Sequence, residues 1–350
     1  MDDQNRRDRP GYMPSRPAAG TVRCARRALF SAGVALLPAA LAPAWRAAAD
    51  SPPTEPDPDV GADDPLTIPF LRRYTPQGGE IDVRAVWGRG PGFTSHLISY
   101  PSEGLRITGF MNVPDGSGPF PIVACNHGYI NPAVYRTGQG SKREADYLAA
   151  RGYLTVSSDY RGHGGSEGQP DGGHLDTGYA RDVINLIASA QRHPKADAGR
   201  VGVWGHSMGG NLAYKLMVTR SEVRATVVFA GVSASAVDDF YYLAQMIRRP
   251  LAELVQRFNV PEADPERYAR MSPITYLRWM AGPVQLHHGT ADANVPYWHT
   301  QQLVQALATA GVPYEFYSYP GAPHTFSGAT WELAMRRTVA FFDRYLKGAS

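Results

Sequence analysis

A serine stands between glycines in residues 205–210, which read Gly-His-Ser-Met-Gly-Gly. An apolar run with valines precedes this motif and a helix-like run begins at Asn211, so Ser207 is predicted to lie on a sharp turn from a strand into a helix. The glycines remove side chains that would collide at such a turn. The pattern alone is weak evidence in a chain with 36 glycines. Its place at a strand end makes Ser207 a candidate nucleophile.

A serine hydroxyl needs a base to take its proton, and that base needs a carboxylate to hold its tautomer. Around this kind of motif the chain order is serine, acid, histidine. Asp292 and His324 each directly follow a strand-like run, and the carboxyl ends of parallel strands meet at one edge of a sheet. We therefore predict that Asp292 and His324 lie beside Ser207. Asp238 and Asp239 are alternative acids.

Backbone N–H groups must bind the charge that develops on the substrate oxygen. Met208 follows the serine at the predicted helix N-terminus, where the helix dipole also favours negative charge. Tyr129 ends the segment Asn126-His-Gly-Tyr129, in which Gly128 lets the backbone turn toward the site. We expect the N–H groups of Met208 and Tyr129 to form the oxyanion hole.

Several ring side chains could shape a substrate pocket. Glycine-rich loops hold two further histidines that could line it, His163 and His174. Metal-ligand spacings such as His-x-x-x-His or paired cysteines do not occur, so we expect neither a metal nor another cofactor. The candidate pocket residues are His206, Tyr241, Tyr242 and Trp298.

Strand-like and helix-like runs alternate along most of the chain, which predicts a mostly parallel sheet covered by helices on both faces. Residues 95–100 and 105–113 alternate in polarity around a short turn and predict an antiparallel hairpin at the sheet edge. About fifty residues, 232–281, contain no strand-like run and are predicted to form a small helical cap over the site. We expect one catalytic domain over residues 67–350, including this cap.

The first 49 residues combine arginines, the apolar stretch Ala28–Ala44 and Ala47-Ala-Ala49, which is typical of an export signal. Arg26-Arg27 partly resembles the twin-arginine signal. Export to the periplasm or outside the cell is therefore expected, with an uncleaved N-terminal membrane anchor as the alternative. After cleavage we expect no stable membrane insertion. Residues 50–66 are rich in proline and acids and predict a disordered linker.

The charge of the chain is concentrated in this leader. Residues 1–49 hold eight Arg and three Asp, a net charge of +5, against +3 for the whole chain, which leaves about −2 for the remainder. The high isoelectric point thus gives no support for nucleic-acid binding, and no basic cluster occurs downstream. Nothing in the sequence indicates an oligomeric state.

Six segments, taken together, make residues 90–350 resemble the α/β-hydrolase fold, and most of all the catalytic domain of the prolyl oligopeptidase family and related exported esterases. The resemblance implies Ser207, Asp292 and His324 as the catalytic triad. Peptidases of that family carry a β-propeller ahead of this domain, whereas here only about forty folded residues are expected there. The segments are Asn126–Tyr129, Asp159–Gly164, Gly205–Gly210, Ser272–Ile274, His288–Asp292 and Pro323-His324.

These observations predict an exported serine hydrolase that cleaves carboxylic esters through an acyl-enzyme. The alternative is a serine peptidase of the prolyl oligopeptidase type, an aminopeptidase or acylpeptide hydrolase, although no paired-glutamate segment for a free amino terminus is found. An acyltransferase and a non-catalytic binding protein are weaker alternatives. The expected partner is a small ester or short peptide.

Overall fold

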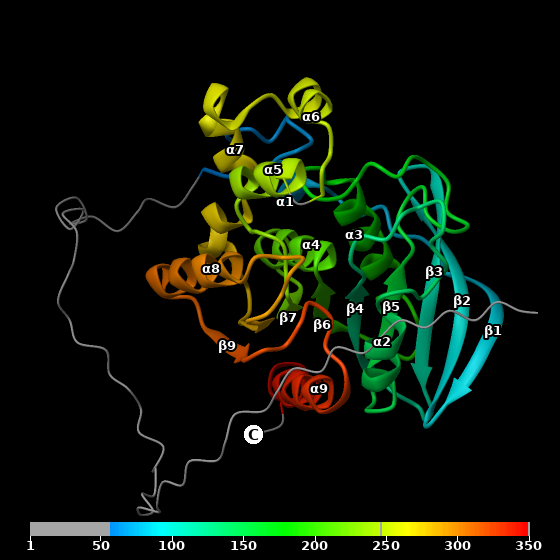
Figure 1. Cartoon of the computed structure of the whole chain (residues 1–350). Coiled ribbons are helices and arrows are strands. Elements are labelled where there is room, and N and C mark those ends of the chain that lie inside the picture. The colour runs from blue at the N-terminus through cyan, green and yellow to red at the C-terminus, as the bar shows by residue number, and fades with distance from the viewer. Residues whose placement is uncertain (1–56, 246, 349–350) are drawn as a thin grey trace, which may run out of the picture. The chain divides into compact units, whose positions relative to one another are not determined.

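The computed structural model describes residues 57–245 and 247–348 (Figure 1). The predicted export signal and residues 50–56 lie outside these ranges. In the described part of the chain one sheet has nine strands in the order β1-β2-β3-β5-β4-β6-β7-β8-β9. The strands are β1 (Asp82–Gly90), β2 (Phe93–Ser102), β3 (Leu105–Pro114), β4 (Phe120–Asn126), β5 (Leu154–Ser158), β6 (Ala196–His206), β7 (Val223–Phe229), β8 (Val284–Gly289) and β9 (Tyr314–Tyr319).

The sheet changes character at β5. Strands β1, β2 and β3 are antiparallel, and β3 also pairs antiparallel with β5, whereas β4 to β9 pair in parallel. The predicted mostly parallel sheet with an antiparallel N-terminal hairpin is confirmed. One strand was not predicted: β1 lies outside the hairpin. Its side chains are exposed along almost its whole length, so its sequence lacks the alternation that reveals a half-buried strand.

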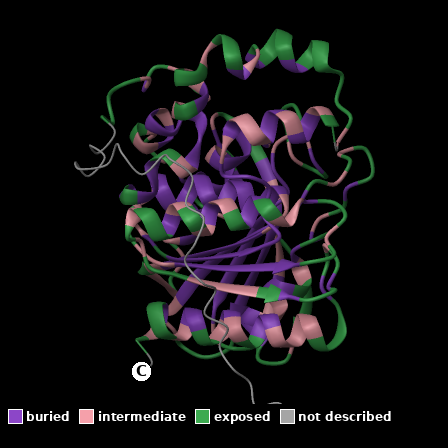
Figure 2. Cartoon of the chain, turned by 60° about the vertical axis from the view of Figure 1, so that its left-hand side comes forward, coloured by how far each residue is buried: buried purple, intermediate pink, exposed green. Residues whose placement is uncertain are grey.

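Helices cover both faces of the sheet. Alternate residues of the central strands point to opposite sides: Val203 of β6 joins the apolar core under α1, α3, α4 and α8, and Trp204 joins the core under α2 and α9. Figure 2 shows the strands buried between helices whose outer sides are exposed. These helices are α1 (Ile68–Arg73), α2 (Lys142–Ala149), α3 (Gly178–Ala190), α4 (Met208–Thr219), α8 (Tyr297–Ala310) and α9 (Gly328–Phe342), which the π-helix η3 (Asp343–Lys347) continues.

The predicted cap region lies between β7 and β8, and its described residues form only helical elements and loops. Its side chains form an apolar cluster of their own around Phe240, Leu254 and Tyr268. Figure 1 shows α5, α6 and α7 gathered near α1. The elements are α5 (Ala236–Gln245), α6 (Leu251–Phe258), η1 (Pro261–Ala263), α7 (Pro265–Met271) and η2 (Pro273–Trp279).

The structure differs from the prediction of a disordered linker over its last ten residues. Residues 57–66 form turns whose acidic side chains meet arginines: Asp59 pairs with Arg73, and Asp64 lies 2.6 Å from the Arg267 guanidinium of α7. Leu66 packs against the cap cluster. The acidic composition that suggested disorder thus supplies partners for cations of the folded part.

None of the helices in the described part of the chain is long and apolar enough to cross a membrane. The apolar stretch of the predicted export signal lies outside that part.

Candidate active site

Ser207 lies at the turn from β6 into α4 in a strained backbone conformation. Its φ of 57° and ψ of −120° are outside the regions that side-chain-bearing residues usually adopt. A Cβ at Gly205 would overlap the carbonyl oxygen of Gly209, and a Cβ at Gly209 would overlap that of Asn126. Only glycine therefore fits on both sides of the serine, which explains why the motif has this spacing.

Asp292 and His324 are in contact, as their positions after β8 and β9 predicted. The Nδ1 atom of His324 lies 2.7 Å from Oδ2 of Asp292. The backbone N–H groups of Asn294 and Val295 each donate to Oδ1 of Asp292 at 2.8 Å. Burial by itself would raise the pKa of Asp292, but hydrogen bonds from the histidines and the charge of His324 hold that pKa below its usual value. Asp292 is thus an ionised acceptor that orients the His324 ring.

His288, which its place at the end of a strand-like run would indicate only as a packing or support residue, is a second imidazole donor to Asp292. Its Nε2 lies 3.1 Å from Asp292 Oδ2 and 3.2 Å from the carbonyl oxygen of Val295, two acceptors, so this nitrogen carries the proton. Its Nδ1 then accepts from the Thr300 hydroxyl at 2.7 Å. The sequence feature that could have indicated this contact is the position of His288, four residues before Asp292.

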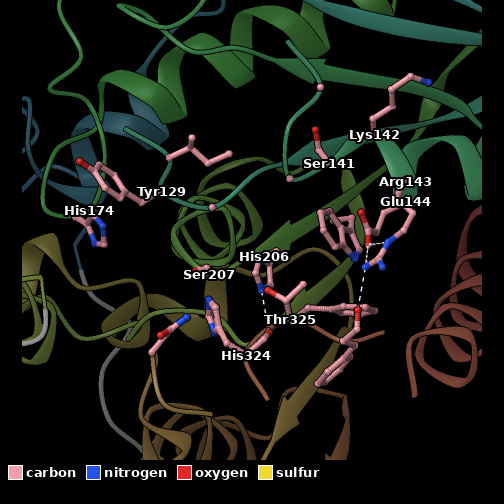
Figure 3. A pocket seen from close by; sticks show the side chains of 18 of the residues that line it. Tyr129, Ser141, Lys142, Arg143, Glu144, His174, His206, Ser207, His324 and Thr325 are labelled. Carbon is pink, nitrogen blue, oxygen red and sulfur yellow. Dashed lines mark hydrogen bonds and ion pairs between the residues drawn. The ribbon is translucent and has the colours of Figure 1, made fainter. Parts of the chain in front are cut away.

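Ser207 and His324 line one cavity of about 680 Å³. Figure 3 shows the His324 ring directly below Ser207 in that cavity. Among the described residues no hydrogen bond joins the Ser207 hydroxyl to the ring. Such bonds are often long in unliganded sites and shorten when the substrate is bound.

His206 lines the cavity as predicted and anchors the loop that carries His324. Its Nε2 lies 3.1 Å from the carbonyl oxygen of His324, and the two ring centroids are 4.6 Å apart. Burial, assisted by the nearby His324, lowers the pKa of His206 to about 4. The ring is therefore neutral near pH 7 and donates its Nε2 proton to that carbonyl.

The backbone of the two predicted oxyanion donors runs beside the serine. Met208 is the first residue of α4, so its N–H has no partner within the helix. A Cβ built on Gly128 would lie 3.0 Å from the Ser207 Cβ, so the loop before Tyr129 passes close to the Ser207 side chain. Tyr129 itself lines the cavity with about half of its side chain exposed.

Two predicted pocket residues lie elsewhere. Tyr241 donates its hydroxyl hydrogen bond to Glu262 on the cap surface, whereas its neighbour Tyr242 lines the cavity. Successive residues of a helix point about 100° apart, so both rings could not face the same space. Trp298, in the first turn of α8, is 48% exposed and packs edge-on against His299.

The alternative residues also have definite places. Asp238 accepts a 2.8 Å hydrogen bond from Gln302, and Asp239 contacts His174 rather than His324. His174 lines the cavity. His163 is instead buried among aromatic rings, 5.3 Å from that of Tyr135. Among the described residues no group of three or more His, Cys, Asp or Glu side chains could hold a metal ion.

The cavity has two chemically different ends. Figure 3 shows Tyr129 and His174 on one side of Ser207, and His206, Arg143 and Glu144 on the other. The remaining lining is largely apolar and aromatic, a composition typical of small-molecule sites. It includes Ile130, Trp204, Phe229, Tyr242, Ile247 and Phe326.

A model of the prolyl oligopeptidase family matches residues 139–349, more than half of the chain, with Ser207, Asp292 and His324 inside the match. The chain belongs to the prolyl oligopeptidase family. It is thus a serine hydrolase. A curated relative is the uncharacterized peptidase YtmA of Bacillus subtilis, 26% identical over 232 residues, which are 66% of this chain and 86% of the relative.

Solved structures of peptidases and esterases share the fold. An acylaminoacyl peptidase from Pyrococcus horikoshii has a TM-score of 0.61 at 20% identity, covering 74% of this chain and 43% of its own. Acetyl xylan esterase 1 from Thermoanaerobacterium sp. JW/SL YS485 has a TM-score of 0.59 at 21% identity, and the match covers 83% of this chain and 94% of the esterase. The chain thus spans less than half of that peptidase and nearly all of that esterase. These likenesses confirm the α/β-hydrolase fold.

Proposed function

We propose that this serine hydrolase cleaves carboxylic esters, with Ser207 as nucleophile, His324 as general base and Asp292 as the residue that orients the base. The observation that carries the proposal is the Asp292–His324 hydrogen bond in the cavity that also contains the strained Ser207. Strained backbone outliers gather at functional sites, where the surrounding structure maintains them.

The reaction would proceed in two steps. Ser207 Oγ attacks the ester carbonyl carbon while Nε2 of His324 takes the hydroxyl proton, and Asp292 stabilises the resulting imidazolium at Nδ1. The N–H groups of Met208 and Tyr129 bind the oxyanion, and His324 then protonates the departing alcohol. Water, deprotonated by His324, attacks the acyl-enzyme and releases the acid and free Ser207.

The charge of the cavity favours an ester over a peptide with a free amino terminus. Glu144 is the one acidic side chain that lines the cavity among residues 57–245 and 247–348. Its carboxylate already pairs with Arg143 at 2.8 Å and accepts from Trp331 Nε1 at 2.7 Å. Within this described lining, the charge of the one carboxylate is thus already offset by a guanidinium, which disfavours a substrate ammonium group there.

A panel of 4-nitrophenyl esters with acyl chains of increasing length, assayed beside aminoacyl 4-nitroanilides, tests this proposal. Ester turnover well above anilide turnover, abolished in Ser207→Ala, is the expected result. A fluorophosphonate probe should label the wild type and not this variant. Equal labelling of both proteins would remove Ser207 from the mechanism.

A serine peptidase is the second candidate, because the family and the relative YtmA are named for peptidase activity. Anilide or acylpeptide cleavage faster than ester cleavage in the same panel would favour it.

We also propose that residues 1–49 direct export, on the strength of their arginines, apolar stretch and alanine site. Expression of the full chain in a bacterium, followed by fractionation and N-terminal sequencing of the product, tests this. A protein that begins near residue 50 in the periplasm or medium would support a cleaved signal. An intact N-terminus in the membrane fraction would support the anchor.

A further inference from the structure

A second Asp–His pair lies in the wall of the same cavity. Nδ1 of His174, in the loop between β5 and α3, is 2.9 Å from Oδ1 of Asp239 on α5. Asp239 is 1% exposed, and its other oxygen lies 3.5 Å from the Asn211 side-chain amide. The pair thus joins the cap to the nucleophile helix α4 and fixes the direction of the His174 ring.

The backbone at His174 is strained, and a buried lysine stabilises it. Its φ is 55°, in the left-handed region that a residue with a side chain rarely adopts. The buried ammonium of Lys215 donates to the His174 carbonyl, and also to the carbonyl of Asp176 at 2.9 Å and to Asn211 Oδ1 at 2.8 Å. A strained residue that several buried contacts maintain in a cavity wall indicates a functional position.

Further charged groups lie around the pair. Burial lowers the pKa of Lys215 to about 8, against the opposing effect of Asp239 and Asp176, so this group is largely charged at neutral pH. Lys215 lies in the field of the Asp239 carboxylate, and Arg257 pairs with Asp176 at 2.5 Å and with Asp171 at 3.4 Å. Nδ1 of His174 faces a carboxylate oxygen and therefore carries the proton, which it donates to Asp239.

That tautomer leaves Nε2 of His174 as a hydrogen-bond acceptor. The residue lines the cavity, and within the described part of the chain its ring makes a hydrogen bond through Nδ1 but none through Nε2. Tyr242, whose ring centroid lies 6.1 Å from that of His174, also lines the cavity, and Tyr129 lies on the same side of it (Figure 3). A neutral acceptor in such surroundings suits a hydroxyl group better than an ammonium group, which would call for a free carboxylate.

We propose that His174 is a substrate-binding residue whose Nε2 accepts a hydrogen bond from a hydroxyl group of the ester, so that the enzyme selects hydroxylated esters. This inference rests on the proposed esterase function. Asp239 is the positioning residue that holds His174 in the accepting tautomer.

Matched substrates in wild type and His174→Asn test it. Asparagine tolerates a positive φ and can still bond Asp239, but its side chain is too short to place an acceptor where Nε2 lies. The acyl series is the 4-nitrophenyl esters of 3-methyl-, 3-hydroxy- and 3-aminobutanoic acid. The alcohol pair is 2,3-dihydroxypropyl and 2-methylbutyl butanoate. Comparing the variant with wild type on each substrate cancels differences in intrinsic reactivity.

The expected result is a kcat/KM loss about five- to tenfold larger for the hydroxylated member of one set than for its methyl partner, as for one lost neutral hydrogen bond. An equal loss on all substrates, or no loss, overturns the proposal, because a merely structural role would not depend on the substrate. A larger loss on the amino ester overturns the hydroxyl assignment and makes the ligand an ammonium group.

Two further variants keep the test independent of folding. Asp239→Asn retains the His174 ring but no longer fixes its tautomer, and the same loss of hydroxyl selectivity is expected from it. Tyr241→Phe, on the same helix but outside the cavity, is the control and should leave the selectivity unchanged. Fluorophosphonate labelling reports Ser207 separately: labelling with ester turnover but without a selectivity change defeats only this inference, whereas no turnover at all defeats the proposed esterase.

Discussion

The two Asp–His pairs of this cavity differ in what holds them. Asp292 and His324 stand on loops at the ends of neighbouring parallel strands, and Asp292 accepts from two ring nitrogens and two backbone N–H groups. Asp239 and His174 come from a cap helix and a long loop, and a buried lysine stabilises their surroundings. The first pair is built into the sheet, and the second depends on how the cap packs. We expect the first pair to be needed for the turnover of every substrate, and the second pair to matter only for hydroxylated esters.

The same substitution in each pair should separate them most strongly. Asp292→Asn should lower kcat by about 10⁴ on all esters, because the amide favours the wrong tautomer of His324. The corresponding substitution in a serine protease triad has an effect of about that size. Asp239→Asn should leave the methyl-substituted esters within about threefold of wild type. Initial rates with a saturating 4-nitrophenyl ester, on proteins with matched melting curves, measure both. Comparable losses in the two variants would mean that the pairs do not differ in role.

The stability of the fold in acid should depend on His206, the buried ring beside His324. The pKa of His206 is lowered to about 4, so folding favours the neutral ring, whose contribution is complete above pH ~6.5 and is lost as the pH falls toward 4. His206→Gln keeps a donor for the His324 carbonyl but cannot be protonated. It should lose about 1 kcal/mol less stability than wild type between pH 7 and pH 5, a reduced figure because the ring is partly open to the cavity. Urea unfolding at both pH values measures this, and parallel losses would contradict it.

The sequence predicted the first pair better than the second for a physical reason. A residue directly after a parallel strand has a known place at the sheet edge, so Asp292 and His324 could be assigned from order alone. No such rule relates a loop after β5 to a helix of the cap, and Asp239 was considered only as an alternative acid. Its contact with His174 depends on packing over 65 residues of separation.

The same contrast explains the other differences. Tyr241 and Tyr242 are chemically alike, and only the rotation of α5 decides which of them reaches the cavity. β1 and residues 57–66 escaped prediction because one has no buried face and the other gains its order from distant arginines. The hairpin, predicted over residues 95–100 and 105–113 from its alternating polarity, agrees with β2 and β3 to within a few residues.

His288 should contribute a smaller effect to the first pair. His288→Gln removes one of the two ring donors to Asp292 and leaves the backbone donors and His324 in place. We expect kcat to fall about five- to tenfold on every substrate, the size of one hydrogen bond, with KM unchanged. A loss as large as that of Asp292→Asn would show that His288, rather than the backbone, sets the position of the carboxylate. Steady-state kinetics on two esters of different acyl length distinguish these outcomes.

The smallest effects should come from the two aromatic residues that lie outside the cavity. Trp298 is about half exposed on α8, and Tyr241 bonds to Glu262 on the cap surface. Trp298→Ala and Tyr241→Phe should therefore change kcat/KM by less than about twofold, since exposed substitutions away from a site rarely matter. Tyr242→Ala, which opens the cavity wall beside His174, is the matched comparison and should raise KM severalfold. If Trp298→Ala raised KM as much as Tyr242→Ala, bound substrate would have to extend beyond the cavity across α8.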